Sequence, residues 1–496
     1  MTPVRASGAA PSRPCDDPAP ETLLPPVGES PPNRWTSATY AARVLRLYDT
    51  ASGEVRELAQ RQPGQVDIYL CGPTVYGPPH LGHGRATLAY DVLRRYLEWS
   101  GTRVRLVSNI TDIDDKIIAR ANQEGRDSDE IARRCEAVWF RAMRGIGVDP
   151  PTDIPHATDY VEQMVAMIGQ LIEIGRAYPT EDGVYLDVTS VEDYGLLAHQ
   201  SLDQMLVGGG EREVYGQEQK HHPADFALWK AAKPDEPSWP SPWGDGRPGW
   251  HTECVVMSLD LLGDGFDLHC GGLDLKFPHH ENERAQAVAL GHRFANHWMH
   301  HAFVVDESGE KMSKSVGNIE NLLDLIEKVD GRAFRMVLLQ AHYRSPVQVG
   351  RDRLEAAERA LGRVDALARR TSDLPDAEPD ATTLSAFAAS MDDDLDTPGA
   401  MAVVFDAISG ANSLLDAGDT TGAAPLVAAV WSMCAAVGLV PRADDDVPDD
   451  IARQVAALDA ARAERDFAVA DTLRSALQAE GWVVETTKDG TRVHRA

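Results

Sequence analysis

The chain of 496 residues has no long hydrophobic run, few cysteines and comparatively few basic residues. No apolar stretch reaches the roughly 18 residues of a membrane-spanning helix, so we expect no membrane partner. The six cysteines have no framework spacing, which excludes a disulfide-stapled secreted domain and favours the reducing cytoplasm. The start of the chain is rich in Pro, Ser and Ala without the apolar core of a secretory signal. We therefore expect residues 1–43 to form a disordered extension.

The shortage of basic residues argues at first sight against a polyanionic partner. There are 48 Lys and Arg against 77 Asp and Glu, a formal net charge of −29. This charge is unevenly spread, because Ser372 to Asp450 holds sixteen acidic residues and one base, Arg442. From Ile451 to the end, seven bases meet seven acids. The final segment is therefore far less repulsive to phosphate than the average charge implies.

Apolar patterning predicts an α/β fold at the start of the ordered chain. Val66–Cys71 reads as a buried strand, Ala86–Trp99 has helical spacing, and Arg103–Ile110 reads as a second strand. Two strand–helix units in succession indicate a parallel sheet with ligands at the carboxyl ends of its strands. The irregular pattern of residues 151–240 predicts an insertion that splits this sheet. Helical periodicity beyond Gly331 predicts a helical bundle.

The turn between the first strand and its helix contains CGPTVYGPPHLGHGR. Glycines let a ligand approach the backbone, and His80 and His83 share one face if the helix begins at Leu81. Unpaired N–H groups at a helix amino terminus bind anions, and imidazoles there can donate to phosphate oxygens. The residues alone are equally compatible with a tight turn that carries surface histidines.

A second candidate phosphate-binding stretch reads EKMSKSVGN, with Lys311 and Lys314 among hydroxyl residues. Flanking glycines at 309 and 317 would let such a loop close over a triphosphate, on which lysine acts as a compact point charge. By itself the stretch is also compatible with any solvated basic loop.

HLGH followed by KMSKS on an α/β frame resembles the paired signature of class I aminoacyl-tRNA synthetases. The order of CGPTVY, NITDIDDKI, DFALWK, GRPGWHTEC, FPHHENE, HYRSP and MDDDLDTPGA further resembles the cysteinyl-tRNA synthetases, from about Val44 to near the end. The resemblance implies a Rossmann-type catalytic domain split by a connective insertion, then an α-helical bundle and a small C-terminal α+β unit. The expected segments are 1–43 (extension), 44–150 (first Rossmann half), 151–240 (connective insertion), 241–305 (second half), 306–350 (KMSKS loop and stem-contact region), 351–440 (bundle) and 451–496 (anticodon-end unit).

Four residues are candidate metal ligands: Cys71, Cys254, His279 and Glu283. His279 and Glu283 are four apart, so they share a helix face and can hold one ion, and two thiolates with an imidazole and a carboxylate suit Zn²⁺. Without the family context, the cysteines could equally be small buried apolar residues. The resemblance implies that these four positions hold one Zn²⁺ per subunit.

A zinc ion would explain how such an enzyme separates cysteine from serine. Shape alone would distinguish two side chains that differ by one atom by about 1–3 kcal/mol. A substrate thiol can become a soft thiolate ligand, whereas a hydroxyl is a far poorer one. The resemblance also implies that Thr111, Trp250, His269 and Asp274 bind L-cysteine, although a lone Trp is often core and an Asp in CGGLDL is often a turn cap.

The resemblance implies a cysteine–tRNA ligase that works in two steps. Cysteine attacks the α-phosphate of ATP, giving cysteinyl adenylate and pyrophosphate, and tRNA-Cys then accepts the aminoacyl group on its terminal adenosine. His80, His83, Lys311 and Lys314 would act on the phosphates, Thr74 and Gly82 would also contact ATP, and Mg²⁺ would accompany it. We expect a monomer.

Three features depart from the family pattern. Cys270 stands where a glycine is usual, so we expect an additional thiol beside the zinc site. The terminal GTRVHRA lacks the usual tryptophan, and the N-terminal extension has no inferred role. The tail bases Arg462, Arg465, Arg474, Lys488 and Arg492 are compatible with RNA contact, but also with an ordinary charged helix.

Two rival functions remain open at this point. A paralogue could transfer activated cysteine to a small amine, as the mycothiol-pathway cysteine ligases do, but those relatives lack the full RNA-binding tail. A nonenzymatic RNA-binding protein descended from a synthetase would not need HLGH, KMSKS and four zinc ligands.

Overall fold

The computed structural model describes residues 44–207, 219–234, 236–306, 321–443, 449–487 and 490–495. The expected extension (1–43) lies outside these residues, as do Lys311, Lys314 and Lys488. Within the described ranges, no helix is both long enough and apolar enough to cross a bilayer.

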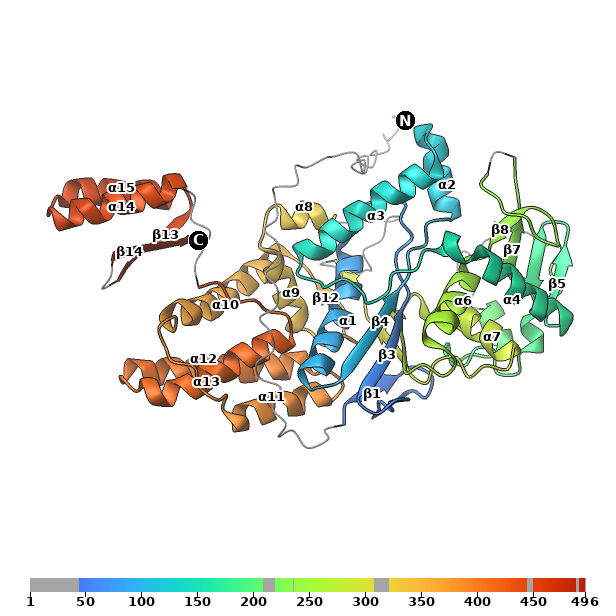
Figure 1. Ribbon diagram of the computed structural model, residues 1–496, viewed down its shortest axis with the longest axis horizontal. Coiled ribbons are helices and arrows are strands. Elements are labelled where there is room, and N and C mark those ends of the chain that lie inside the picture. Colours follow the sequence, from blue (N-terminus) through green and yellow to red (C-terminus); the bar gives the residue numbers. More distant parts are fainter. Residues whose placement is uncertain are drawn as a thin grey trace, which may run out of the picture.

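A four-stranded parallel sheet, with β3 and β4 near the middle of Figure 1, lies at the centre of the predicted α/β part, in the order β10–β9–β3–β4. The strands are β3 (Gln65–Leu70), β4 (Arg103–Ser108), β9 (Leu268–Gly272) and β10 (Trp298–His301). The two expected strands pair in register from Gln65↔Arg103 to Leu70↔Ser108. Their parallel arrangement, with β9 on the other side of β3, confirms the α/β prediction and brings four carboxyl ends to one edge.

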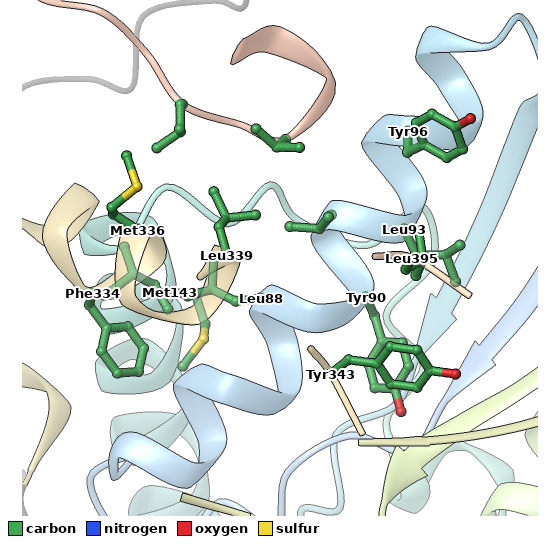
Figure 2. Packing of buried hydrophobic residues seen from close by; sticks show 14 of the residues in the cluster. Leu88, Tyr90, Leu93, Tyr96, Met143, Phe334, Met336, Leu339, Tyr343 and Leu395 are labelled. Carbon is green, nitrogen blue, oxygen red and sulfur yellow. The ribbon is translucent and has the colours of Figure 1, made fainter. Parts of the chain in front are cut away.

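Helix α1 (Leu81–Trp99) connects β3 to β4 and begins earlier than the Ala86 expected from apolar spacing. The first turn of the helix is polar and rich in glycine, so the spacing of apolar residues does not reveal where the helix starts. The His80 N–H donates to His83 Nδ1 at 3.2 Å and closes the first turn. Further along, buried Leu88 and Leu93 pack in a cluster with residues of α9 (Gly331–Leu339), among them Phe334 (Figure 2).

The connective segment forms its own antiparallel sheet, in the order β5–β6–β7–β8. The strands are β5 (Ala177–Thr180), β6 (Gly183–Leu186), β7 (Phe226–Ala231) and β8 (Gly246–Pro248), and α4 (Val161–Glu173) precedes them. Trp229 is fully buried in the core that this sheet shares with α4. Since this sheet lies between β4 and β9 in the chain, it interrupts the parallel sheet as an insertion. It then leads through α6 (Trp250–Leu262), β9 and α7 (Glu281–Ala289) to β10.

A helical bundle follows, in the region beyond Gly331 where helical periodicity predicted one. Its helices are α10 (Arg351–Arg370), α11 (Ala381–Asp392), α12 (Thr397–Asp416) and α13 (Thr420–Ala436). The final unit pairs α14 (Asp449–Ala463) with α15 (Phe467–Ala479) and a hairpin of β13 (Trp482–Thr487) and β14 (Gly490–Arg495). It has its own small core around Leu458 and Leu477.

The remaining elements connect these parts. They are β1 (Arg46–Asp49), β2 (Glu54–Glu57), α2 (Asp115–Glu124), α3 (Ser128–Gly145), α5 (Leu202–Val207), β11 (Val304–Val305), α8 (Leu322–Ile326), β12 (Val347–Gln348) and the short turns Ala157–Tyr160, Val188–Ser190 and Lys276–His280. The structure is compatible with the expected segmentation, whose boundaries stay a prediction.

Candidate active site and metal centre

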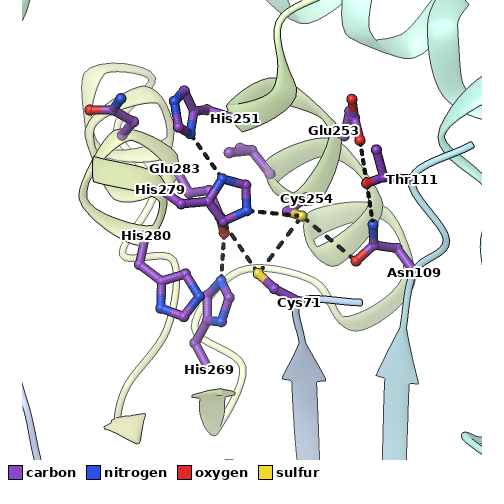
Figure 3. A network of polar contacts seen from close by, with 12 residues as sticks. Cys71, Asn109, Thr111, His251, Glu253, Cys254, His269, His279, His280 and Glu283 are labelled. Atoms are coloured by element: carbon purple, nitrogen blue, oxygen red, sulfur yellow. Dashed lines mark hydrogen bonds and ion pairs between the residues drawn. The ribbon is translucent and has the colours of Figure 1, made fainter. Parts of the chain in front are cut away.

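The four predicted metal ligands come together from three elements at the carboxyl edge of the sheet (Figure 3). Cys71 follows β3, Cys254 lies on α6, and His279 and Glu283 lie on either side of the start of α7. Their candidate ligand atoms are all within 4.8 Å of one another. Cys254, His279 and Glu283 are buried, whereas Cys71 is half-buried.

Direct contacts join these side chains. Glu283 Oε1 lies 2.8 Å from His279 Nε2 and accepts from the Cys71 thiol at 3.3 Å. The Cys254 sulfur lies 3.8 Å from that of Cys71 and 3.7 Å from His279 Nε2. The two sulfurs, the imidazole nitrogen and the carboxylate oxygen therefore surround one small volume.

The electrostatics of the cluster favour a cation. Burial opposes ionisation of Cys254, but hydrogen bonds with Cys71 and His279 lower the pKa of its thiol to about 6. Burial disfavours the His279 imidazolium, yet Glu283 and Cys254 raise the pKa of that imidazole to about 10. Burial raises the pKa of the Cys71 thiol well above its usual value, so this group keeps its proton. The Cys254 thiolate and the Glu283 carboxylate are thus anions beside the protonated His279 and Cys71, and a metal ion could replace those protons. Two sulfurs, an imidazole and a carboxylate form a donor set that fits Zn²⁺.

A second set of possible ligands overlaps the first. His269 and His280, with Cys71 and Glu283, also place their ligand atoms within 4.8 Å of one another. His269 Nε2 lies 2.6 Å from Glu283 Oε2, so each carboxylate oxygen has its own imidazole partner. His269 thus lies at the predicted metal centre.

Cys270 does not join this cluster, contrary to the expectation of an additional thiol beside the metal. It belongs to the apolar core on the α1 side of the sheet, where Tyr90 also packs, and neither group of possible ligands in the described residues includes it. Adjacent residues of a strand point to opposite faces, so His269 faces the cluster and Cys270 faces away. Burial raises the pKa of its thiol well above the usual value.

The expected cysteine pocket borders the cluster. The buried Thr111 hydroxyl donates to Glu253 Oε2 at 2.8 Å, and Trp250 stacks on His279 with ring centroids 3.9 Å apart. Trp250 is 36% exposed, which places it as a cover of the cluster rather than as core. Asp274 is exposed just after β9, and an added Cβ at Gly272 would lie 2.4 Å from its Oδ1.

The HLGH turn supplies a second group of polar side chains at the same edge. The rings of His80 and His83 are stacked, with centroids 3.7 Å apart, which fulfils the expected shared face. A Cβ at Gly82 would lie 2.9 Å from His80 Cε1, so a larger residue there would shift the His80 ring. Thr74 forms an isolated parallel bridge with Thr111 and so links this turn to the pocket.

Three residues of the site were not singled out from the sequence. Asn109 Oδ1 accepts from Gly72 N–H and its amide donates to Thr111, while Glu253 accepts from Thr111 (Figure 3). His251 Nδ1 lies 2.9 Å from His279 Nδ1 and so fixes the ring whose Nε2 faces the cluster. All three stand within or beside the motifs NIT and GWHTEC, and only their hydrogen bonds reveal their roles.

Comparison with known proteins agrees with this geometry. Residues 57–359 match the model of the tRNA synthetases class I (C) catalytic domain, and residues 386–440 match the DALR domain. A cysteine–tRNA ligase of Halorhodospira halophila is 43% identical over 91% of this chain and 100% of that protein, and one of Streptomyces avermitilis is 42% identical over 90% and 98%.

Among solved structures, the fold resembles that of a methionyl-tRNA synthetase of Mycobacterium tuberculosis in complex with methionyl-adenylate. The TM-score is 0.56 at 16% identity, over 82% of this chain and 96% of that one. With its Rossmann-type sheet, HLGH helix and thiol–imidazole cluster, the chain belongs to the cysteine–tRNA ligase family of class I aminoacyl-tRNA synthetases.

Proposed function

We propose that this enzyme activates L-cysteine with ATP to cysteinyl adenylate and pyrophosphate, and then transfers cysteine to the 3′-terminal adenosine of tRNA-Cys. The observation that carries the proposal is the convergence of Cys71, Cys254, His279 and Glu283 at the edge of the sheet where β3 ends, the same strand end from which the HLGH turn leads into α1. Family membership supplies the reaction type. The cluster supplies a chemical reason for the choice of cysteine.

In this proposal, Cys71, Cys254, His279 and Glu283 hold one Zn²⁺. When bound, the ion supplies a soft Lewis-acidic position that suits a thiolate far better than a hydroxyl. His251 contacts His279 Nδ1, and His269 contacts Glu283 Oε2. Each thereby orients a ligand through the atom that does not face the ion. Trp250 stacks on His279 and is itself partly exposed, so it covers the solvent side of the cluster and excludes water from it. Such a site separates cysteine from serine without a hydrolytic editing step.

The substrate's other groups are assigned to the neighbouring residues. Thr111 and Asp274 bind the ammonium group of cysteine, and His269 lines the floor of the pocket. Asn109 donates to the Thr111 hydroxyl, which in turn donates to Glu253, so the oxygen of Thr111 keeps a lone pair for a donor such as ammonium. This arrangement fixes the amino acid with its carboxylate toward the HLGH turn.

We assign the phosphates of ATP to the amino terminus of α1 and to the KMSKS loop. His80 and His83 donate to the α-phosphoryl region as charge develops, with Thr74 and Gly82 lining the approach. Lys311 and Lys314 neutralise the leaving pyrophosphate, together with Mg²⁺. No side-chain nucleophile is required, because the substrate carboxylate attacks the α-phosphorus of ATP and the bond from that phosphorus to the α–β bridging oxygen breaks, so that pyrophosphate leaves.

The final unit is proposed to contact tRNA, although two of its bases already have structural partners. Arg462 donates to Thr491 Oγ1 at 2.6 Å, and Arg474 donates to the Val484 carbonyl at 3.2 Å. These two side chains hold the helices to the hairpin. Arg465 is the better candidate for RNA, and the cytoplasmic location and monomeric state stay predictions.

Cysteine-dependent ATP–pyrophosphate exchange and transfer of labelled cysteine to tRNA-Cys test the proposal. The wild-type chain should catalyse both, and Cys254→Ser should lose zinc and cysteine activation while keeping its fold. Transfer to a small amine but not to tRNA would instead establish a cysteine ligase of the rival kind. Absence of exchange would leave a nonenzymatic RNA-binding role. Unchanged cysteine affinity in Cys254→Ser would contradict its assignment as a ligand.

A further inference from the structure

Arg85, two residues after His83 on α1, is a buried charge that the proposed chemistry does not use. Only 2% of this residue is exposed. Its Nε donates to the Ala302 carbonyl at 2.7 Å, and its Nη2 donates to the carbonyls of Tyr343 at 2.9 Å and Ser345 at 2.6 Å. One guanidinium therefore joins α1 to two segments that are remote in sequence.

The two segments lie at functionally important places. Ala302 follows β10 and precedes β11, on the chain that leads into the KMSKS region. Tyr343 and Ser345 belong to HYRSP, which leads into β12, and β12 pairs with β11. On the far side of the KMSKS region, Leu322 N–H donates to the Pro79 carbonyl at 3.0 Å. Residues just before and just after the first turn of α1 are thus connected to both flanks of the second signature motif.

Arg85 occupies this position at an energetic cost. Among the residues that the structure describes, no carboxylate forms an ion pair with it, and burial lowers the pKa of its guanidinium to about 10. A buried charge without a counter-ion is less stable than a well-packed apolar side chain of similar volume. An apolar side chain, however, cannot replace the planar guanidinium fork, whose N–H groups hold several carbonyls at fixed angles.

The connection continues beyond HYRSP. The Tyr343 hydroxyl donates to Asp394 Oδ1 at 2.6 Å, and Tyr48 N–H donates to the same oxygen at 2.8 Å. Asp394 precedes α12 of the helical bundle, and Tyr48 lies on β1. Two of the carbonyls that Arg85 holds, those of Tyr343 and Ser345, therefore belong to a segment that is itself anchored to the bundle.

We propose that Arg85 is a positioning residue for adenylate formation, which holds the HLGH helix at a fixed orientation to the segments that carry the KMSKS motif. The inference rests on the proposed function. Displacement of reacting groups by about 1 Å can reduce a rate by about 100-fold. Loss of the fork should therefore reduce kcat, while the proposed cysteine pocket, none of whose residues receives a hydrogen bond from Arg85, keeps its affinity.

Three variants at this position test the inference by pyrophosphate exchange, each measured below its melting temperature. Arg85→Met should lower kcat about 10- to 100-fold, with KM for cysteine and zinc content within about twofold of wild type. Arg85→Lys, which keeps a charge but loses the fork, should also lower kcat and is the variant expected to fold if Met is not tolerated. In Arg85→Ala, added guanidinium ion should restore part of kcat.

Arg94→Met is the matched control. Arg94 lies on the same helix and binds Glu98 and the Pro150 carbonyl near the surface, so its loss should leave kcat unchanged. Wild-type kcat in folded Arg85→Lys and Arg85→Met would overturn the inference. A fall in melting temperature with no change in kcat would show a purely structural role and also overturn it. A wild-type chain without cysteine-dependent exchange would instead refute the proposed function.

Discussion

Glu283 and His269 form a fully buried pair, with Oε2 2.6 Å from Nε2. This contact holds one carboxylate oxygen away from the cluster and leaves Oε1 facing Cys71 and His279. The pair therefore decides which oxygen of Glu283 a metal can use. Partners behind a ligand usually matter to metal affinity by about 10- to 100-fold.

Replacement of this partner should weaken metal binding. His269→Leu removes the hydrogen-bond partner and leaves Glu283 free to rotate, so we expect zinc affinity to fall about 10- to 100-fold, as measured by competition with a chromophoric chelator. His292→Leu, at a half-buried histidine outside the metal cluster, serves as control and should bind zinc as wild type does. Unchanged affinity in His269→Leu would show that the pair plays no part in holding the ligand.

The histidine pair of HLGH should act on the phosphate chemistry alone. In His83→Ala, we expect kcat of pyrophosphate exchange to fall about 100- to 1,000-fold, because a donor to developing charge is lost from a preorganised site. Zinc content and the KM for cysteine should stay near wild type, since His83 contacts His80 and Trp139 rather than the metal cluster. A parallel loss of zinc would argue that the variant disturbs the whole edge of the sheet.

Gly272 tests the position of Asp274 in the cysteine pocket. A Cβ there would lie 2.4 Å from Asp274 Oδ1, so Gly272→Ala should displace that carboxylate and raise the KM for cysteine severalfold, with little change in the KM for ATP. Gly169→Ala on α4 has open space around it and should change neither constant. Equal cysteine KM values in the two variants would remove Asp274 from the pocket.

Two buried histidines should make stability fall in mild acid. Burial lowers the pKa of His297 to about 4 and that of His300 to about 3, against about 6.5 in the unfolded chain. Between the folded and unfolded pKa values, the unfolded chain binds more protons than the folded chain, so the free energy of unfolding rises with pH. The stability that these two neutral histidines contribute is therefore lost as the pH falls below about 6.5.

His300→Gln should reduce this dependence. The side-chain amide can still meet Thr50 Oγ1, which lies 2.7 Å from His300 Nδ1, but it does not titrate. Urea unfolding midpoints at pH 5 and pH 7 should therefore differ less in the variant than in wild type. An identical difference in both proteins would show that His300 is protonated in the folded state.

The sequence alone predicted the main units of the fold because their signals are local. Strands β3 and β4 have strong apolar patterning, and the structure places them within a few residues of the expected Val66–Cys71 and Arg103–Ile110, while the bundle helices lie beyond Gly331 as their periodicity predicted. The start of α1 was harder to predict, since glycines and histidines make its first turn polar. The metal candidates followed from residue types and from family resemblance, rather than from periodicity.

Features that depend on strand pairing and on which face a residue occupies were not predictable. Cys270 was expected beside the metal, yet the alternation of β9 sends it to the opposite face from His269. The roles of Asn109, Glu253 and Arg85 depend on contacts between segments remote in sequence. No local pattern encodes them.

The most direct test of the account is cysteine activation by metal-stripped protein. Protein dialysed against chelator should remain folded by circular dichroism, lose cysteine-dependent pyrophosphate exchange, and regain it on addition of one equivalent of Zn²⁺. Metal-free protein that still activates cysteine at the full rate, and still rejects serine, would contradict the claim that Cys71, Cys254, His279 and Glu283 select the substrate through a bound ion.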